Sequence, residues 1–238
     1  MIKGLLFDFD GVIVDTEVPT FESWREIYAE HGVDLALDDW LPAVGSGSST
    51  SGAFDAVAHL EGLIGTTLDR EAVIERRAGR KAELYSAAPL LPGVRERLAE
   101  AQERDIATAI VTRNREDRVR AQCAAVDLDH EWQAVICANE EPTRDKAELY
   151  RDALAVLEVV PSEALAFEDS PSGVRAARRA GVLCAAVPNE ITRGATFDDA
   201  DLVLTSLAEQ SLDEILQLLG QGARRVGLTP RAPTPRKR

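Results

Sequence analysis

The sequence lacks any long hydrophobic run. Its 238 residues are 45% hydrophobic, but no apolar stretch approaches the roughly 20 residues that cross a bilayer. The amino-terminus also lacks the basic, apolar and small-residue succession of a secretory signal peptide, because the chain enters an apolar segment directly. We therefore expect a cytoplasmic protein without membrane contact, long enough for one large domain or two modest ones.

Cysteine is scarce. The chain has three cysteines, Cys123, Cys137 and Cys184, which are odd in number and widely spaced. Disulfide frameworks and zinc sites need cysteines in paired, closer spacings. The prediction is three buried free thiols.

Positive charge is scarce as well. The formal net charge is −14, and because residues 221–238 are basic without any acidic residue, the rest of the chain is more acidic still. Such a body repels nucleic acid and anionic membranes. It would also repel a phosphorylated substrate, so a site for one must depend on a metal ion and a few placed cations. Lysine occurs four times in the sequence, which draws attention to Lys146 ahead of a predicted helix.

Two aspartates follow the first apolar run. Residues 2–7 are apolar without a helical period, which predicts a strand buried on both faces of a parallel sheet. Asp8 and Asp10 come next, at the edge where open α/β sheets bind ligands, and alternation along the chain points both side chains the same way. Their charges need a compensating cation. The alternative is that they cap the following helix, a role that fits Asp15 or Thr16 better.

The rest of the chain has two patterns. Residues 16–88 are predicted to be helical, with aromatic residues at a spacing typical of a core. From residue 89 helices alternate with short apolar runs, which predicts a parallel sheet with right-handed crossovers. The expected strands are 106–111, 134–137, 164–167, 182–187 and 202–204, and the expected helices are 93–104, 115–125, 145–158, 172–180 and 207–219. The fold class is therefore α/β, with core residues 1–15 and 89–220 and a helical cap domain, 16–88, inserted after the first strand.

Two segments have no apolar period. Residues 45–52 are a polar run of glycine, serine and threonine, which is either a flexible linker or a loop that meets substrate. Residues 221–238 are rich in proline and arginine, and we expect them to be a disordered tail.

A second acidic pair ends another predicted strand. Glu168 and Asp169 follow the run 164–167 and precede Ser-Pro-Ser-Gly and a helix, which repeats the arrangement of the first motif. By themselves they fit a helix-capping turn. Together with Asp8 and Asp10 they form a set of carboxylates at one sheet edge, which predicts a Mg²⁺ site, because Mg²⁺ prefers oxygen ligands.

Candidate phosphate-binding residues come from two further strands. Thr112, Arg113 and Asn114 follow the run 106–111, where a hydroxyl and an amide next to a helix can hold phosphate oxygens. Lys146 opens a helix after the next strand, and its ammonium could neutralise a phosphate and a nucleophilic carboxylate together.

These motifs resemble those of the haloacid dehalogenase superfamily of phosphohydrolases, in the subgroup with a helical cap after the first strand. The stretch DFDGVIVDTE resembles motif I, Thr112 matches motif II, Lys146 motif III and EDSPSG motif IV. The resemblance spans residues 1–215 and implies a Rossmann-like core.

The resemblance also implies roles. Asp8 would attack phosphorus and form an aspartyl phosphate, and Asp10 would act as general acid and then as general base. Mg²⁺ would be held by Asp8, the Asp10 carbonyl and Asp169, with Glu168 in support. The transferring phosphoryl group would be held by Thr112 and Lys146.

Motif III departs from the family pattern. The family places its lysine in a Lys-Pro-x-Pro-Asp stretch before an aromatic residue, whereas this chain has EPTRDKAELY. An alignment on Tyr150 without a gap puts Arg144 at the lysine position, and a shortened turn puts Lys146 there. Lys146 is favoured because the chemistry needs a compact ammonium.

Several functions fit such a fold. A dehalogenase lacks the second motif I aspartate, and a phosphonate hydrolase needs a cap lysine, for which Lys81 is the one candidate. A sugar-phosphate mutase shares every core residue but carries basic cap-loop residues that bind the distal phosphate, which residues 43–53 lack, although arginines elsewhere in the cap could compensate. A silent metabolite-binding protein would not need the intact acidic set. The expected function is therefore a Mg²⁺-dependent phosphatase for a small phosphorylated metabolite, with a mutase as the alternative and no signal for an oligomeric state.

Overall fold

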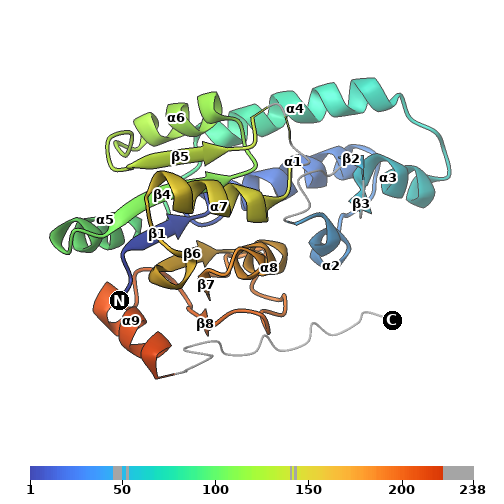
Figure 1. Cartoon of the computed structure of the whole chain (residues 1–238). Helices are drawn as coiled ribbons and strands as arrows, with labels where there is room; N and C mark the ends of the chain where they lie inside the picture. The colour runs from blue at the N-terminus through green and yellow to red at the C-terminus, as the bar shows by residue number, and fades with distance from the viewer. Residues whose placement is uncertain (45–49, 52–53, 140, 142–143, 222–238) are drawn as a thin grey trace.

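The computed structural model describes residues 1–221 apart from 45–49, 52–53, 140 and 142–143. Its main sheet has six parallel strands in the order β5-β4-β1-β6-β7-β8 (Figure 1). The strands are β1 (Gly4–Phe7), β4 (Ala107–Thr112), β5 (Ala134–Cys137), β6 (Ala164–Glu168), β7 (Leu183–Ala186) and β8 (Leu202–Val203). The predicted α/β class with a parallel sheet is confirmed.

Strand β1 lies in the middle of the sheet and is fully buried. Its last residue, Phe7, is in register with Ile110 of β4 on one side and with Phe167 of β6 on the other. Because all three strands are parallel, the residues that follow them meet at one edge. The register therefore puts Asp8 level with Glu168 and one residue short of Thr112.

Helices cover both faces of the sheet. One core packs α5 (Val94–Glu103), α6 (Glu116–Ala125) and α9 (Leu212–Gly220) against the face that carries Leu5 and Phe7. The other packs α7 (Lys146–Val156) and α8 (Pro171–Arg179) against the face of Leu6. A short 3-10 turn, Pro161–Glu163, precedes β6. Alternate residues of β1 thus enter opposite cores, as a buried central strand requires.

The inserted segment has a core of its own. Helices α1 (Glu17–Glu30) and α4 (Arg70–Ser86) lie side by side, with α2 (Leu37–Trp40), a 3-10 turn at Leu41–Ala43 and α3 (Ala56–Ile64) beside them (Figure 1). The predicted core aromatics, including Trp24 and Tyr28, are buried here. The expectation of helix throughout is wrong at one place, where β2 (Thr50–Ser51) pairs antiparallel with β3 (Phe54–Asp55). Strands of two residues are too short to leave an alternating pattern in the sequence.

The insert leaves and rejoins the sheet domain at adjacent points. Asp15 donates its backbone N–H to the Pro89 carbonyl at 3.0 Å, and Leu91 donates to the Ile13 carbonyl at 2.9 Å. Between these bonds, Val14 and Leu90 form an antiparallel bridge. These crossings support a division of the chain at residues 15/16 and 88/89, which stays a prediction.

The last helix begins later than the sequence pattern indicated. Helix α9 starts at Leu212 rather than at 207, because Ser211 and Glu214 form a capping box in which each side chain bonds to the other residue's backbone N–H. Leu207 is buried ahead of it and accepts a hydrogen bond from Arg97 at 3.1 Å. The other predicted bounds lie within two residues of the observed ones.

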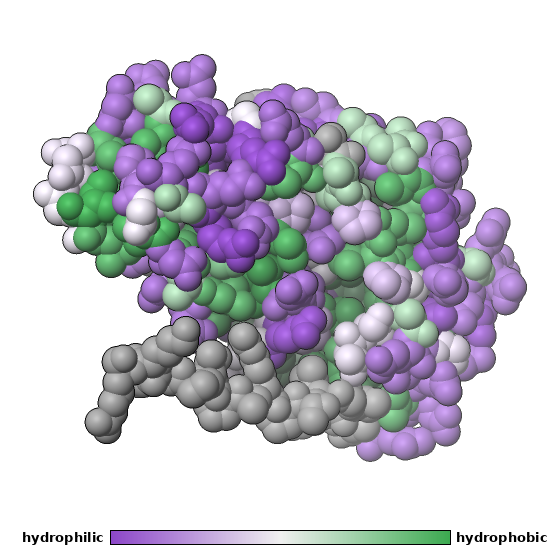
Figure 2. All heavy atoms as spheres, turned by 180° about the vertical axis from the view of Figure 1, so that it is seen from behind, coloured by the Kyte–Doolittle hydropathy of each residue, from purple (hydrophilic) through white to green (hydrophobic). Residues whose placement is uncertain are grey.

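The surface and the thiols agree with the composition. Hydrophilic side chains spread over much of the face in Figure 2. The three cysteines are buried and free, as predicted. None of the helices in the described ranges has the length and apolarity of a membrane span. Apart from Gln221, the predicted tail 221–238 lies outside the described residues, as does most of the polar run 45–52.

Candidate active site

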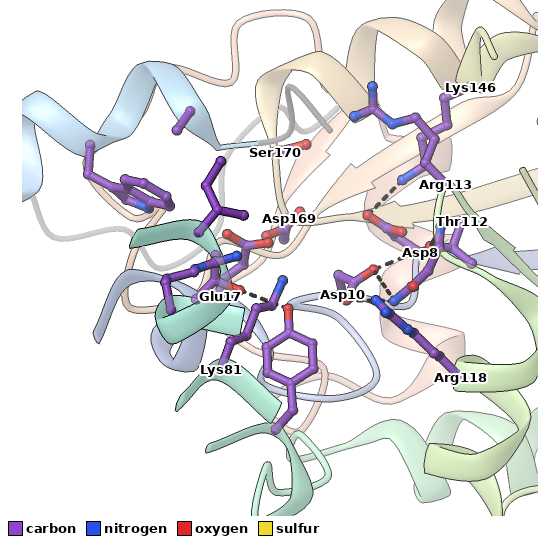
Figure 3. A pocket seen from close by; sticks show the side chains of 17 residues that line it. Asp8, Asp10, Glu17, Lys81, Thr112, Arg113, Arg118, Lys146, Asp169 and Ser170 are labelled. Atoms are coloured by element: carbon purple, nitrogen blue, oxygen red, sulfur yellow. Dashed lines mark hydrogen bonds and ion pairs between the residues drawn. The ribbon is translucent and has the colours of Figure 1, made fainter. Parts of the chain in front are cut away.

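A cavity of about 400 Å³ opens at the carboxyl edge of the sheet, beneath the inserted helices. All the predicted site residues except Glu168 line this cavity, and all of them come from the sheet domain. They are Asp8, Asp10, Thr112, Arg113, Asn114, Lys146 and Asp169. The insert and α6 contribute further charged side chains (Figure 3). The cavity thus joins residues that are distant in the sequence.

Lys146 lies between two carboxylates. Its Nζ is 2.7 Å from Asp8 Oδ2 and 2.7 Å from Glu168 Oε1 (Figure 3). Its side chain is 8% exposed. Burial opposes its charge, but the attraction of Asp8 and Glu168 outweighs burial and raises the pKa of Lys146. The lysine therefore stays an ammonium throughout the physiological range.

Asp8 binds its proton more tightly than an ordinary aspartate. Burial raises the pKa of Asp8 to about 7, and the nearby charge of Glu168 adds to this effect while Lys146 opposes it. Asp8 Oδ1 also accepts a hydrogen bond from the Phe9 backbone at 2.7 Å, which fixes its carboxylate. A single lysine does not fully compensate these buried acids, so the site favours an additional cation.

Asp10 is held by three polar side chains. Thr16 donates its hydroxyl to Asp10 Oδ1 at 2.8 Å, Thr112 donates to Oδ2 at 3.3 Å, and Asn114 Nδ2 lies 3.4 Å from Oδ2. Burial and the charge of Asp8 raise the pKa of Asp10. A carboxyl group with these properties can keep a proton and deliver it in a fixed direction.

Of the two residues predicted to cap α1, Thr16 has the N-cap position and Asp15 makes the hydrogen bond to the first turn. Thr16 occupies the N-cap position of α1 but makes no capping bond with its side chain, since its hydroxyl points to Asp10. Asp15 Oδ1 instead accepts a hydrogen bond from Val18 N at 3.3 Å. Thr16 therefore belongs to the site, which the sequence pattern did not indicate.

Three buried carboxylates could hold a metal ion. Asp8, Glu168 and Asp169 each place an oxygen within 4.8 Å of the others. Burial, and then the charges of Glu17, Asp8 and Glu168, raise the pKa of Asp169 well above its ordinary value. Among the described residues, the buried Glu168 Oε2 has no hydrogen-bond partner. An all-oxygen set with an orphaned acceptor and excess negative charge fits Mg²⁺.

Two glycines let these acids approach the backbone. Gly11 has φ +77°, and a Cβ there would overlap Asp169 Oδ2. A Cβ on Gly173, in the first turn of α8, would overlap Glu168 Oε2. Both acids thus depend on positions that tolerate no side chain.

Two supporting residues were not predicted. Tyr150 donates its buried hydroxyl to Glu168 Oε1 at 2.6 Å, and Asn189 Nδ2 donates to Asp169 Oδ2 at 2.8 Å. Burial and the charge of Glu168 raise the pKa of Tyr150 well above its ordinary value, so it stays a donor. In the sequence Tyr150 was an alignment landmark only, and Asn189 lies in a loop without any motif.

Arg144 lies away from the nucleophile. Its guanidinium pairs with Asp152 at 2.6 Å and with Glu148 at 3.7 Å. The ammonium beside Asp8 therefore comes from Lys146. Arg113 lines the main cavity and also a second one of about 340 Å³ beside Arg144.

Comparison with known proteins identifies relatives along most of the chain. The haloacid dehalogenase-like hydrolase family matches residues 5–187. YhcW of Bacillus subtilis is 36% identical over 220 residues, which cover 92% of this chain and 98% of YhcW. Validoxylamine A 7'-phosphate phosphatase of Streptomyces hygroscopicus is 30% identical over 212 residues, 88% of this chain and 96% of that enzyme.

A solved structure shows the same fold. CbbY from Rhodobacter sphaeroides in complex with phosphate superimposes with a TM-score of 0.68 and 27% identity, over 90% of this chain and 99% of CbbY. The sheet domain and the inserted helices both fall within this overlap.

Proposed function

Because the chain belongs to the haloacid dehalogenase-like hydrolase family, we propose that it is a Mg²⁺-dependent phosphatase for a small phosphorylated metabolite, such as a sugar phosphate. The observation that carries the proposal is the pairing of Lys146 with Asp8 beside a hydrogen-bonded Asp10. The pairing favours the carboxylate form of Asp8, which would be the nucleophile, and Asp10 in the same cavity would carry the proton. The matched relatives include a named phosphatase.

In the first step an oxygen of Asp8 attacks phosphorus. The bond between phosphorus and the leaving oxygen breaks, and Asp10 gives its proton to that oxygen, which departs as an alcohol. Lys146 favours the ionised form of Asp8 against the effect of burial and offsets the charge of the phosphoryl group. Thr112 and Asn114 line the same cavity, and their donors, which face Asp10 in this structure, would turn to the phosphoryl oxygens of a substrate.

In the second step Asp10, now a carboxylate, takes a proton from water. The water oxygen attacks phosphorus, and the bond between phosphorus and Asp8 breaks, which yields inorganic phosphate and restores the Asp8 carboxylate. Thr16 holds Asp10 through its 2.8 Å hydrogen bond, so the same oxygen pair can serve both proton transfers.

Asp8, Glu168 and Asp169 would hold the Mg²⁺ ion together with the Asp10 carbonyl. When bound, Mg²⁺ supplies positive charge that allows an anionic nucleophile to approach an anionic ester. Tyr150 and Lys146 both bind Glu168 Oε1, which leaves Oε2 for another partner.

The test is turnover of phosphate esters with Mg²⁺ present. Purified protein is incubated with sugar phosphates, nucleotides and phosphoglycolate, and phosphate release is measured together with isomer formation. Release is expected, and Asp8→Asn should lower it at least about 10³-fold. Asp129→Asn, at an exposed aspartate, is the matched control. Isomer formation without release would replace the proposal by a mutase, and no turnover would favour a silent binding protein.

A further inference from the structure

The second cavity, of about 340 Å³, lies beside α7 and α8, and every described residue of its lining belongs to the sheet domain. Most of these residues are cations, and one is a carboxylate. They are Arg113, Arg144, Asp145, Lys146, Ser172, Arg175, Ala176 and Arg179. The lining thus has the opposite charge to the chain as a whole, whose net charge is −14. This contrast favours an anion in the cavity.

The single lining carboxylate is already occupied. Asp145 Oδ1 lies 2.5 Å from Arg179 Nη2 and accepts a hydrogen bond from the Ala147 backbone at 3.0 Å. Arg144 is paired with Asp152 at 2.6 Å, outside the lining. Arg144 is therefore a wall of the cavity whose charge is offset, and Asp145 has no charge to spare for a further arginine.

Arg175 has no counterion. Its side chain lines the cavity, and it forms neither an ion pair nor a hydrogen bond with any residue in the described part of the chain. On α8 it lies four residues before Arg179, a spacing that makes two like charges neighbours and slightly destabilises a helix. An anion between the two guanidinium groups would replace this repulsion by attraction.

One face of α8 forms a side of the cavity. Ser172, Arg175, Ala176 and Arg179 follow the spacing i, i+3, i+4 and i+7, which places them on the same side of a helix. The small Ala176 side chain leaves room between the longer ones. Ser172 lies in the first turn of α8, where the backbone N–H groups and the helix dipole favour an anion.

The second cavity shares two cations with the active site. Arg113 and Lys146 line both cavities, and Figure 3 shows these two residues side by side. Lys146 already faces Asp8 and Glu168. An anion in the second cavity would therefore lower the positive potential that the active site offers to a phosphoryl group.

We propose that the second cavity binds a di- or triphosphate chain, free or as part of a nucleotide, through Arg113, Arg175 and Arg179, and that the bound chain weakens substrate binding in the active site. Arginine side chains bind phosphate oxygens in pairs, and a chain of phosphates offers three guanidinium groups more such pairs than a single phosphate does. The binding itself is independent of the proposed function, whereas the effect on substrate binding rests on it.

Calorimetry of the metal-free protein with tripolyphosphate tests the binding. Without Mg²⁺ the acids of the active site repel the probe, so the signal comes from the second cavity. We expect one site per chain, at which tripolyphosphate binds at least about 10-fold more tightly than orthophosphate. Absence of binding, or equal affinity for the two probes, would overturn the proposal.

Substitutions on α8 assign the binding to the cavity. Arg175→Gln should weaken tripolyphosphate binding about 10- to 100-fold, the loss expected for a charge-assisted contact. Arg178→Gln removes the same charge from the same helix, but Arg178 donates to the Asp199 carbonyl at 2.8 Å and lies outside the lining, so affinity should be kept. Equal losses in the two variants would overturn the proposal.

ATP in place of tripolyphosphate distinguishes the two sources of the chain. Tighter binding of ATP would identify a nucleotide as the ligand, and equal or weaker binding would identify the free chain. Either result supports a site for the chain.

Initial rates at a fixed concentration of free Mg²⁺ test the effect on the active site. Tripolyphosphate should raise the KM to a plateau about 5- to 10-fold higher, because the chain and the substrate occupy different cavities. The rise should be lost in Arg175→Gln and kept in Arg178→Gln. A KM that rises without limit, and equally in both variants, would place the probe in the active site and overturn the proposal. Tripolyphosphate binding by a protein without any turnover would instead contradict the proposed function alone.

Discussion

Lys146 Nζ lies 2.7 Å from Asp8 Oδ2, and both side chains are 8% exposed. Asp8 directly follows β1, and Lys146 begins α7, which comes after β5 in the chain. They meet because α7 packs across β5, β4 and β1 with its first residue at the carboxyl edge of these strands. The contact is thus a product of topology, and it joins the proposed nucleophile to its cation.

Lys146→Met should lower turnover about 100- to 1,000-fold, the loss typical of removing one preorganised charge from a catalytic site. The substitution leaves Asp8 and Glu168 without their ammonium, so a lower melting temperature is also expected. Arg144→Met is the matched control, because Arg144 pairs with Asp152 outside the site. The measurement is the initial rate of phosphate release by each variant. Equal losses of rate in Lys146→Met and Arg144→Met would contradict the assignment of Lys146.

Tyr150→Phe should weaken Mg²⁺ binding about 10- to 100-fold, as is usual when a residue that orients a metal ligand is lost. The ring and its packing stay, and the 2.6 Å hydrogen bond to Glu168 disappears. Isothermal calorimetry of Mg²⁺ binding measures the effect directly. Tyr28→Phe, which removes a 2.7 Å hydrogen bond to Ala56 in the insert, is expected to change stability without changing Mg²⁺ affinity.

The sequence predicted those site residues that follow a strand directly. Asp8 and Glu168 mark the ends of apolar runs, and the parallel sheet then dictates that these ends meet. Tyr150 and Asn189 were not predictable in the same way, because a helix face and a loop approach the acids only through tertiary packing. The start of α9 was misplaced because apolar residues ahead of Ser211 extend the helical pattern, while the capping box decides the boundary.

Without metal, the protein should become less stable as the pH rises from about 5 to about 8. Burial raises the pKa of Asp8 and of Glu17 to about 7, above their values in the unfolded chain, so the folded state binds more protons within this window. Stability is then greatest below the pKa values of the unfolded chain, about 4, and falls until the pH has passed the folded values of about 7. Chemical denaturation with chelator at a series of pH values should show a loss of at least about 1 kcal/mol. Asp8→Asn and saturating Mg²⁺ should each reduce this loss. A free energy of unfolding that rises with pH would contradict the explanation that raised carboxyl pKa values cause the loss.

Gly173→Ala should destabilise the protein and weaken Mg²⁺ binding, because the new Cβ would overlap Glu168 Oε2 and displace the carboxylate. We expect a loss of about 1 to 3 kcal/mol, typical of overpacking a buried site. Gly79→Ala is the control, since a Cβ at this exposed position in α4 meets nothing within 4 Å. It should stabilise the protein by about 0.5 to 1 kcal/mol through helix propensity. Denaturation curves and Mg²⁺ titrations of both variants test the contrast.

The bridge between Val14 and Leu90 ties the two ends of the insert to each other at the sheet domain. Because the outgoing and returning segments are tied to each other at the sheet, the distance between them does not depend on what is inserted there. We therefore expect that the inserted helices could be exchanged by grafting while Asp8 and Lys146 remain in place. Such a graft would separate the choice of leaving group from the chemistry proposed at Asp8.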